Sequence, residues 1–511
     1  MVTKRIKTRT QKAKLNMAFS LLQQAVAFVC GMIVPKLMIN SFGSEAYGAT
    51  SSIATFLSYI TLLEGGIGAV TRSALYKAIA SGSKDYISAV VSESKKFYRR
   101  IALAFIGYVI FIAFSFKAIS HNNAFSYWYS VGLVLVIAIS TYADYFIGVT
   151  YSMLLQADQS NYVIAFFRIV TTLLNTMCIV IFISLKWDIL SVKLVSSFVF
   201  ALRPVCTAYY VQKHYHLSPV NNEESFLKNK RSAIGQHIAW ALHNNTDITV
   251  LTIFKDLTYV SVYSIYNMVI SQIQSLLNSF TSGMEAVFGS MYANNEIDNL
   301  QKTFGYYETL ISLISVTLFS TTAVLIVPFV KLYTSGVSDA QYINPVFAIM
   351  LIIAALLYCF RTPYGHMIIA SGRFKETQIA AYGEAIINII VSIVLVVYYG
   401  LVGVAIGTVM ATLFRFVYYA LYLSKHVIHR SALLCAKRII TSVLAFAFTI
   451  LLGKCILQKL SIDSFKSWAI AGVIITFEAG MVSFLFNWIV YMKDVIAIIN
   501  RGFGRINRRK G

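Results

Sequence analysis

The sequence has few charged residues for its length. Of 511 residues only 13% are charged and 58% are hydrophobic, and the mean hydropathy is +0.68. An ordinary soluble domain carries about 25% charged residues. Apolar runs of about 20 residues, the length that crosses a bilayer, recur from Met17 to Met492. This composition excludes a large soluble helical protein, because the surface of such a protein would be mostly apolar.

Acidic residues and paired cysteines are also scarce. Asp and Glu number 21 against 43 Lys and Arg, giving a formal net charge of +22. The basic residues lie in short segments between apolar runs, so the charge does not indicate a nucleic-acid partner. Four of the six cysteines lie inside apolar runs, where Cys behaves as a small hydrophobe, and the other two form no motif. The spacing therefore supports neither a disulfide framework nor a metal site, and we expect no cofactor.

The apolar runs predict an all-α, polytopic membrane protein of about fourteen transmembrane helices. The first run is too long for a signal peptide and lacks a small-residue cleavage site, so we interpret it as a retained span. The break at Gly400 is the least marked, and without it the number of helices is thirteen. The predicted spans are 17–40, 46–69, 101–120, 126–155, 161–185, 188–212, 234–255, 258–291, 305–331, 343–370, 378–399, 401–424, 434–457 and 467–492.

The distribution of Lys and Arg predicts the orientation. With the N-terminus inside, 30 of the 43 Lys and Arg residues fall on the cytoplasmic side, nine fall on the opposite side, and four arginines lie within spans. Because cytoplasmic loops are enriched in Lys and Arg, we predict that both termini are cytoplasmic. The two longest polar stretches, 70–100 and 213–233, are basic and therefore expected inside. Amphipathic spacing in the first predicts short helices along the inner surface, at Leu75, Ile79, Tyr86, Ile87 and Val90.

An internal repeat divides the chain. Several residues recur at an offset of 212 positions, and Asn175 recurs within one residue of that offset, at Asn388. The pairs are Tyr47 with Tyr259, Arg203 with Arg415, Tyr210 with Tyr422, and Lys213 with Lys425. The repeat predicts two lobes of six helices, related by an axis along the membrane normal. The predicted segments are a basic N-terminus (1–16), an N-lobe (17–231), a C-lobe (232–428), two additional helices (429–492) and a basic tail (493–511).

Four arginines lie within the predicted spans, namely Arg168, Arg203, Arg361 and Arg415. Such residues cost roughly 2.5–3.5 kcal/mol each in a bilayer and usually face water or a partner. Arg203 precedes Pro204, and Arg361 lies two residues before Pro363, so a kink there would line a cavity. One interpretation is a cationic cavity for an anionic headgroup, because guanidinium matches phosphate. The alternative is structural pairing with nearby carboxylates.

Polar and acidic residues within the spans are further candidates. The predicted span 234–255 is the most polar, and its His237, His243, Asn244 and Asn245 are expected to line a wet cavity and bind sugar hydroxyls. The histidines are six residues apart, the wrong spacing for a metal. Four acids are candidates for ion coupling, because burial raises a carboxyl pKa toward the physiological range; simple charge balance is the alternative. They are Glu64, Asp144, Asp247 and Glu384.

Three stretches carry a family resemblance: LLEGGIG at 62–68 followed by Arg72, ASGRFKET at 370–377, and GLVGVAIGT at 400–408. Together they resemble the oligosaccharide-lipid flippases (polysaccharide biosynthesis proteins) of the multidrug/oligosaccharidyl-lipid/polysaccharide exporter superfamily. The resemblance implies alternating access between two lobes and transport of a polyprenyl-pyrophosphate-linked glycan to the outer leaflet, driven by an ion gradient. Many relatives carry Asp where Glu64 stands here. The family's cationic cavity corresponds to the four arginines by location only.

The resemblance leaves alternatives open. A drug or metabolite exporter of the same fold is one, although four deep arginines disfavour cationic drugs. A membrane glycan polymerase or glycosyltransferase is another, although the sequence shows no sizeable external loop and no catalytic constellation. We therefore expect a transporter and not an enzyme. The expected setting is the bacterial inner membrane, with a lipid-linked glycan as substrate, membrane lipid around a monomer, a glycan polymerase as an optional partner, and no nucleic acid.

Overall fold

The computed structural model describes residues 9–65, 67–120, 125–215, 217–218, 231–281 and 283–507. The ends of the predicted terminal segments, at 1–8 and 508–511, lie outside this range, as does most of the basic stretch 213–233. Within it the chain divides into two compact units, Met1–Val262 and Tyr263–Gly511. This boundary lies about thirty residues beyond the lobe boundary that the repeat predicts.

Helices account for each predicted span. Those of the first unit are α1 (Arg9–Phe42), α2 (Ser44–Ser58), α3 (Ile60–Glu64), α4 (Ile67–Ser81), α5 (Lys84–Ser120), α6 (Tyr127–Ala143), the π-helix η1 (Asp144–Gly148), α7 (Val149–Ala157), α8 (Asn161–Ser184), α9 (Ile189–Tyr215) and α10 (Arg231–Phe254). α11 (Leu257–Thr281) crosses the boundary. The second unit continues with α12 (Met284–Ala293), α13 (Ile297–Tyr333), α14 (Pro345–Ser371), α15 (Phe374–Tyr399), α16 (Leu401–His426), α17 (Ala432–Gln458) and α18 (Phe465–Asn507).

Eleven of the described helices are long and apolar enough to cross a membrane. The three remaining predicted spans are helical but interrupted or polar: 46–69 is broken between α2 and α3, 258–291 between α11 and α12, and 234–255 is the polar α10. Many large apolar side chains point outward, such as Trp128 at 71% exposed and Ile489 at 76%. A bilayer, and not water, accommodates such a surface. The protein is a multi-pass membrane protein.

The stretch 70–100 differs from its prediction. Instead of several short surface helices it forms α4 and the first half of α5, which continues unbroken for 37 residues. Leu75 and Val90 are 0% and 2% exposed, because α4 packs against α5 and α7. The apolar face that the spacing predicts is present, but it packs against neighbouring helices and not along the membrane surface.

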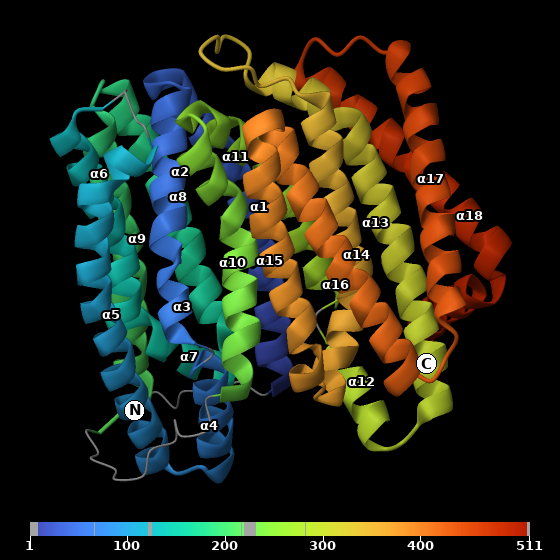
Figure 1. Ribbon diagram of the computed structural model, residues 1–511. Helices are drawn as coiled ribbons and strands as arrows, with labels where there is room; N and C mark the ends of the chain where they lie inside the picture. The colour runs from blue at the N-terminus through green and yellow to red at the C-terminus, as the bar shows by residue number, and fades with distance from the viewer. Residues whose placement is uncertain are drawn as a thin grey trace. The chain divides into compact units, whose positions relative to one another are not determined.

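In the first unit the helices pack as a bundle in which α9 contacts both α6 and α8, and α1 contacts α8. Figure 1 shows α5, α6 and α9 running side by side in this unit, with α4 and α7 toward one end. In the second unit α16 packs against α14 and α15, while α17 and α18 both pack on α13. The additional helices are therefore held by α13.

Candidate functional site

Two of the predicted arginines lie in the first unit beside a predicted coupling acid. Arg203 on α9 forms an ion pair with Asp144, the first residue of η1. Arg168, on the adjacent α8, lies close enough to interact electrostatically with both of them. No ion pair joins Arg168 or Arg72 to a carboxylate among the described residues. Three neighbouring elements therefore supply two guanidinium groups and one carboxylate.

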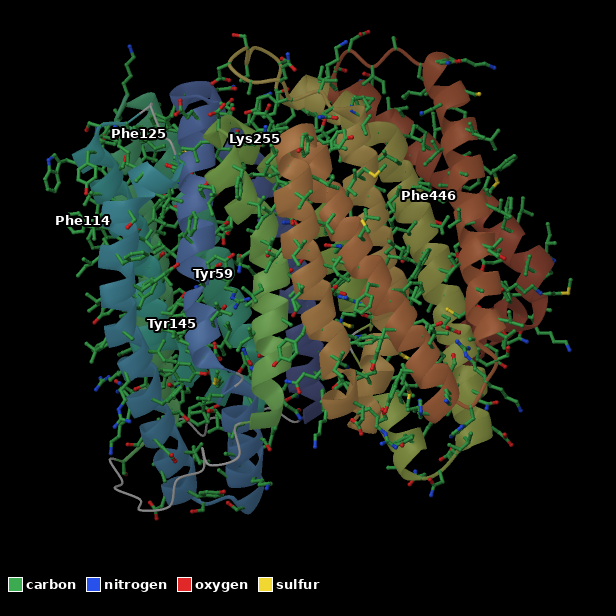
Figure 2. The ribbon with its side chains drawn as sticks, in the orientation of Figure 1. Tyr59, Phe114, Phe125, Tyr145, Lys255 and Phe446 are labelled. Carbon is green, nitrogen blue, oxygen red and sulfur yellow. The ribbon has the colours of Figure 1, made fainter. Side chains whose placement is uncertain are left out.

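A pocket of about 220 Å³ surrounds this group. Arg72 on α4 contributes a third guanidinium, so the lining carries three positive charges against the single negative charge of Asp144. We call this cavity the Arg72 pocket. Its lining consists of Arg72, Asp144, Tyr145, Gly148, Val149, Ser152, Met153, Gln156, Ile164, Arg168, Arg203, Pro204 and Thr207. In unit 1, α4 and α7 lie toward the same end (Figure 1). Tyr145, which lines the pocket, lies nearer to that end than Tyr59 does (Figure 2).

The π-helix gives the pocket its local shape. A π-turn adds one residue to an α-helical path and occurs frequently at functional sites. Gly148 ends η1 in close contact with α9: a Cβ at this position would lie 2.6 Å from the Pro204 Cβ and 3.3 Å from an Asp144 Oδ1. The absence of a side chain at Gly148 therefore lets η1 approach α9 and brings Asp144 to Arg203.

The other two predicted arginines lie in the second unit, where they share one carboxylate. Arg361 on α14 and Arg415 on α16 each pair with a different oxygen of Glu384 on α15. The Glu384 side chain is 0% exposed, and those of the arginines are 10% and 11% exposed. Tyr419 accepts hydrogen bonds from Arg415 Nε and Nη2 at 2.9 and 2.7 Å. The pairing that the sequence left as the alternative is thus present in both units.

The two clusters have the same composition in a different order. In unit 1 the acid is on the predicted fourth span and the arginines are on the fifth and sixth. In unit 2 the acid is on the eleventh, between arginines on the tenth and twelfth. They also differ in access, since the Arg203 and Asp144 side chains are 29% and 32% exposed. The unit 1 cluster borders an open pocket, whereas the unit 2 cluster is closed. Whether the four arginines face one shared chamber stays a prediction.

The polar helix α10 packs against α2 and α3. Ser58 donates to Asn245 Oδ1 at 2.9 Å, and the hydroxyl oxygens of Tyr59 and Thr249 lie 2.9 Å apart. Nearer the C-terminal end of α10, Thr252 Oγ1 lies 2.7 Å from the Oγ of Ser52 on α2. We call these three contacts the α2–α10 seam. Its hydroxyl and amide groups therefore satisfy one another.

The remaining α10 candidates are distributed around the helix. Asn244 is exposed, His243 is half-buried, and Asp247 is 4% exposed. The side chain of His237 lies outside the described residues. Hence, among the three whose side chains are described, Asn245 contacts Ser58 at the end of α2, whereas Asn244 is exposed, so these two do not share the same surroundings.

Glu64 terminates α3 and contacts α5. Tyr98 donates a hydrogen bond of 2.8 Å to Glu64 Oε1, and the adjoining Gly65 has a left-handed φ of 52°, a conformation that ends a helix most easily at glycine. A Cβ at Gly68 would lie 2.5 Å from the same Glu64 oxygen. Gly65 and Gly68 thus allow the chain to turn around this carboxylate.

A charged network that the sequence did not predict joins α13 to the additional helices. Arg430, in the turn after α16, donates to both Glu308 oxygens at 2.5 and 2.6 Å, and Tyr364 of α14 donates to Glu308 as well. Arg438 of α17 donates to Asp494 of α18 at 2.8 Å. Burial lowers the pKa of Arg430, but the Glu308 carboxylate raises that pKa above its usual value, so this arginine stays charged.

Comparison with known proteins shows similarity at the level of the fold. No family model matches the chain, and no curated protein matches it. A solved structure of the lipid II flippase MurJ in an inward closed conformation aligns with a TM-score of 0.70 at 17% identity, covering 94% of this chain and 99% of that one. At this identity the likeness shows that the chain shares the fold of that structure.

Two further structures of this fold align over a smaller part of the chain. An inward-facing multidrug resistance MATE family transporter gives a TM-score of 0.60 at 15% identity, over 78% of this chain and 95% of that one. A MOP superfamily transporter from Pyrococcus furiosus, whose binding pocket is described as having reverse polarity, gives 0.54 at 14% identity, over 82% and 94%. The proteins that share the fold are transporters and a flippase, not enzymes.

Proposed function

We propose that this protein is a flippase that moves a polyprenyl-pyrophosphate-linked oligosaccharide from the cytoplasmic to the outer leaflet by alternating access. The observation that carries the proposal is the extent of the structural alignment. The MurJ structure covers 94% of this chain with a TM-score of 0.70, whereas the MATE and related transporters cover 78–83% with TM-scores of 0.54–0.60. The structural likeness to the flippase thus extends over nearly the whole chain.

The charges within the spans support the same choice. Arg168, Arg203, Arg361 and Arg415 outnumber the two carboxylates paired with them, so each cluster carries a net positive charge. A pyrophosphate headgroup requires such surroundings, because forked guanidinium donors match phosphate oxygens. A pathway for cationic drugs would favour the opposite sign. The proposed setting is the bacterial inner membrane, with both termini cytoplasmic and the chain acting as a monomer.

Coupling to an ion gradient is part of the proposal. Of the four predicted coupling acids, two are not assigned to an arginine cluster. These are Asp247, which is 4% exposed, and Glu64, which accepts a hydrogen bond from Tyr98. A buried carboxyl that gains or loses a proton or a cation between two conformations links the gradient to transport. Asp144 and Glu384 serve first as counter-ions of the arginines.

Reconstitution of the purified protein tests the function. Proteoliposomes would contain a fluorescent polyprenyl-pyrophosphate oligosaccharide, and its movement between leaflets would be followed by quenching from outside. We expect translocation that requires the protein, with no uptake of a fluorescent organic cation under the same gradient. Cation uptake without glycan-lipid movement would favour the drug exporter, and movement of neither would contradict both.

A further inference from the structure

A single carboxyl group lies in the middle of the apolar span of α18. Glu478 follows Lys466 by twelve residues and precedes Lys493 by fifteen, and no other charged residue lies between these two lysines. At 1.5 Å per residue, Glu478 is roughly 18 Å and 22 Å from the two lysines along the helix axis. In a spanning helix this depth is close to the centre of the hydrocarbon layer, which is about 30 Å thick.

The Glu478 side chain is enclosed by protein but makes no hydrogen bond. The residue is 8% exposed, and neither carboxyl oxygen has a hydrogen-bond partner within the part of the chain that the structure describes. Glu384 is also buried, but it lies between two arginines. Glu478 is therefore a buried acid that lacks the counter-charge that Glu384 has.

The helices packed against α18 supply no counter-charge at this depth. In unit 2, α18 packs on α13 and α17 (Figure 1), and neither 311–330 of α13 nor 439–453 of α17 contains a charged residue or a histidine. An ionised carboxylate in such surroundings is very costly, and a buried acid without a partner takes up a proton instead. The charged residues that bound the two stretches are Glu308 and Lys331 on α13, and Arg438 and Lys454 on α17.

Close contacts between the three helices determine which residues lie at the level of Glu478. They make α13 antiparallel to α18 and parallel to α17, which places Ser320 of α13 and Thr449 of α17 near that level. Lys454 follows Thr449 by five residues, and its side chain is exposed. The contacts are Thr317 and Leu325 with a Cβ placed on Gly480 and on Gly472, at 3.8 and 3.7 Å, and Ser312 and Val324 with Ser442 and with a Cβ placed on Gly453, at 2.6 and 2.9 Å.

The two hydroxyl groups at this level suit a protonated acid. Ser320 and Thr449 are both 0% exposed. Each donates its hydroxyl hydrogen to a carbonyl of its own helix, that of Val316 and that of Ala445, so each presents lone pairs and no further hydrogen to its neighbours. A carboxylate only accepts hydrogen bonds, whereas a protonated carboxyl has one O–H to donate. The surroundings therefore match the neutral form of Glu478.

We propose that Glu478 is a proton-binding site of the membrane interior, neutral while α18 packs on α13 and α17 and ionised when these helices separate and water reaches it. The proposed coupling acids Asp247 and Glu64 belong to unit 1, so Glu478 is a different site and does not depend on the proposed function. The ligand is the proton itself, because no group of metal-ligating side chains is found among the described residues. The packed arrangement binds one proton more than the separated one, so raising the pH weakens the packing of α18.

Infrared difference spectroscopy tests the protonation state directly. The full-length wild type and Glu478→Gln would be compared in proteoliposomes at about pH 6, where an ordinary glutamate is ionised because its pKa is about 4.3. We expect the carbonyl stretch of a protonated carboxyl in the wild type that the variant lacks. Glu376→Gln, at an exposed ion pair, is the matched control and should remove only carboxylate bands. Loss of carboxylate bands alone in Glu478→Gln would overturn the proposal.

Labelling with dicyclohexylcarbodiimide identifies the protonated residue. The carboxyl proton moves to a carbodiimide nitrogen while the carboxyl oxygen bonds to the central carbon, and the adduct rearranges to an N-acylurea with no group leaving, so the protonated acid reacts. Ile474 and Met481 beside Glu478 are exposed, so a reagent dissolved in lipid reaches this carboxyl.

Peptide mass spectrometry of the labelled protein compares two buried acids. Glu478 should carry roughly tenfold more adduct than Glu384 or still more, because the protonated fraction changes tenfold for each pH unit between two carboxyls, and Glu384 is held ionised by two arginines. The adduct on Glu478 should decline as the pH rises. Equal labelling of the two residues would contradict the assignment of the proton to Glu478.

Hydrogen exchange in α18, measured at several pH values, tests the link between the proton and the packing. Exchange in the wild type should accelerate with pH more steeply than in Glu478→Gln, which is neutral throughout and shows only the intrinsic pH dependence. If Glu478→Gln fails to fold, Glu478→Met, apolar and of similar size, takes its place. Identical pH profiles in the wild type and the neutral variant would overturn the proposed separation of α18 on loss of the proton.

Discussion

Arg203 and Arg415 lie 212 positions apart in the sequence, and each donates to a carboxylate on another helix of its own unit. The partner of Arg203 is Asp144 and that of Arg415 is Glu384, which do not stand at equivalent positions of the repeat. The arginine is kept at the same place while its counter-charge comes from a different helix.

Glu384→Gln should strongly destabilise the second unit. The substitution leaves Arg361 and Arg415 without their shared counter-ion in a site where the carboxylate is fully buried. Removing one partner of a buried pair costs about 3–5 kcal/mol, so the midpoint of thermal unfolding in detergent should fall markedly. Glu376→Gln, which breaks an exposed pair with Arg373, should leave the midpoint nearly unchanged, because solvent-exposed ion pairs contribute little to stability. Equal midpoints for both variants would contradict a structural role for Glu384.

Gly407→Ala should weaken the packing of α15 against α16. A Cβ at Gly407 would lie 2.2 Å from the Ser392 hydroxyl and 2.9 Å from the Ser392 backbone nitrogen, so the helices must move apart. Overpacking of this kind costs about 1–3 kcal/mol. Gly365→Ala is the matched control, because its Cβ meets no atom within 4 Å. The same unfolding measurement should separate the two, and identical stability would show that the hairpin adapts without cost.

Arg430→Met should loosen the attachment of the additional helices. Arg430 donates two hydrogen bonds to Glu308, and Tyr364 donates a third. Without the guanidinium group, the buried Glu308 carboxylate loses two of these hydrogen bonds and the positive charge that balances it. We expect a loss of about 3–5 kcal/mol, together with faster hydrogen exchange in α17 and α18. Hydrogen exchange measured by mass spectrometry checks this. An increase confined to other helices would contradict the role of the network.

A disulfide across the α2–α10 seam should stop transport. The repeat assigns α2 and α10 to different lobes, yet Ser52 and Thr252 lie in hydroxyl contact at 2.7 Å. Rocking of the lobes then requires this seam to open. In a background without native cysteines, Ser52→Cys with Thr252→Cys should lose glycan-lipid movement on oxidation and regain it with dithiothreitol. The single variants are the controls, and undiminished movement by the oxidised pair would show that the seam does not open.

Much of the helical order was predictable because hydrophobic periodicity and punctuation are local properties. The break at Gly400 was the least marked of those predicted and is confirmed: α15 ends at Tyr399, Gly400 has a left-handed φ of 54°, and α16 begins at Leu401. Gly403 and Gly407, whose small-residue spacing predicts helix packing, do contact the backbone of α15.

The candidate site was less predictable because its partners are distant in sequence. Pairing of the deep arginines with carboxylates was one of the two interpretations that the sequence left open, since both groups are costly alone in a bilayer. The π-helix at Asp144 was not foreseen, because a one-residue insertion leaves no local signal in the apolar pattern. Arg72 was known only as part of a motif, and Glu308 meets Arg430 across 122 positions. Contacts between residues so far apart in the sequence become visible only in the folded structure.

The double variant Arg203→Ala with Arg415→Ala tests the central claim most directly. The two single variants, the double variant and the wild type would be reconstituted at matched protein density, and the initial rate of movement of the fluorescent glycan lipid would be measured. We predict that each single variant slows movement and that the double variant abolishes it while remaining folded by circular dichroism. Movement at the wild-type rate in a folded double variant would contradict an account in which deep arginines hold the phosphate of the transported lipid.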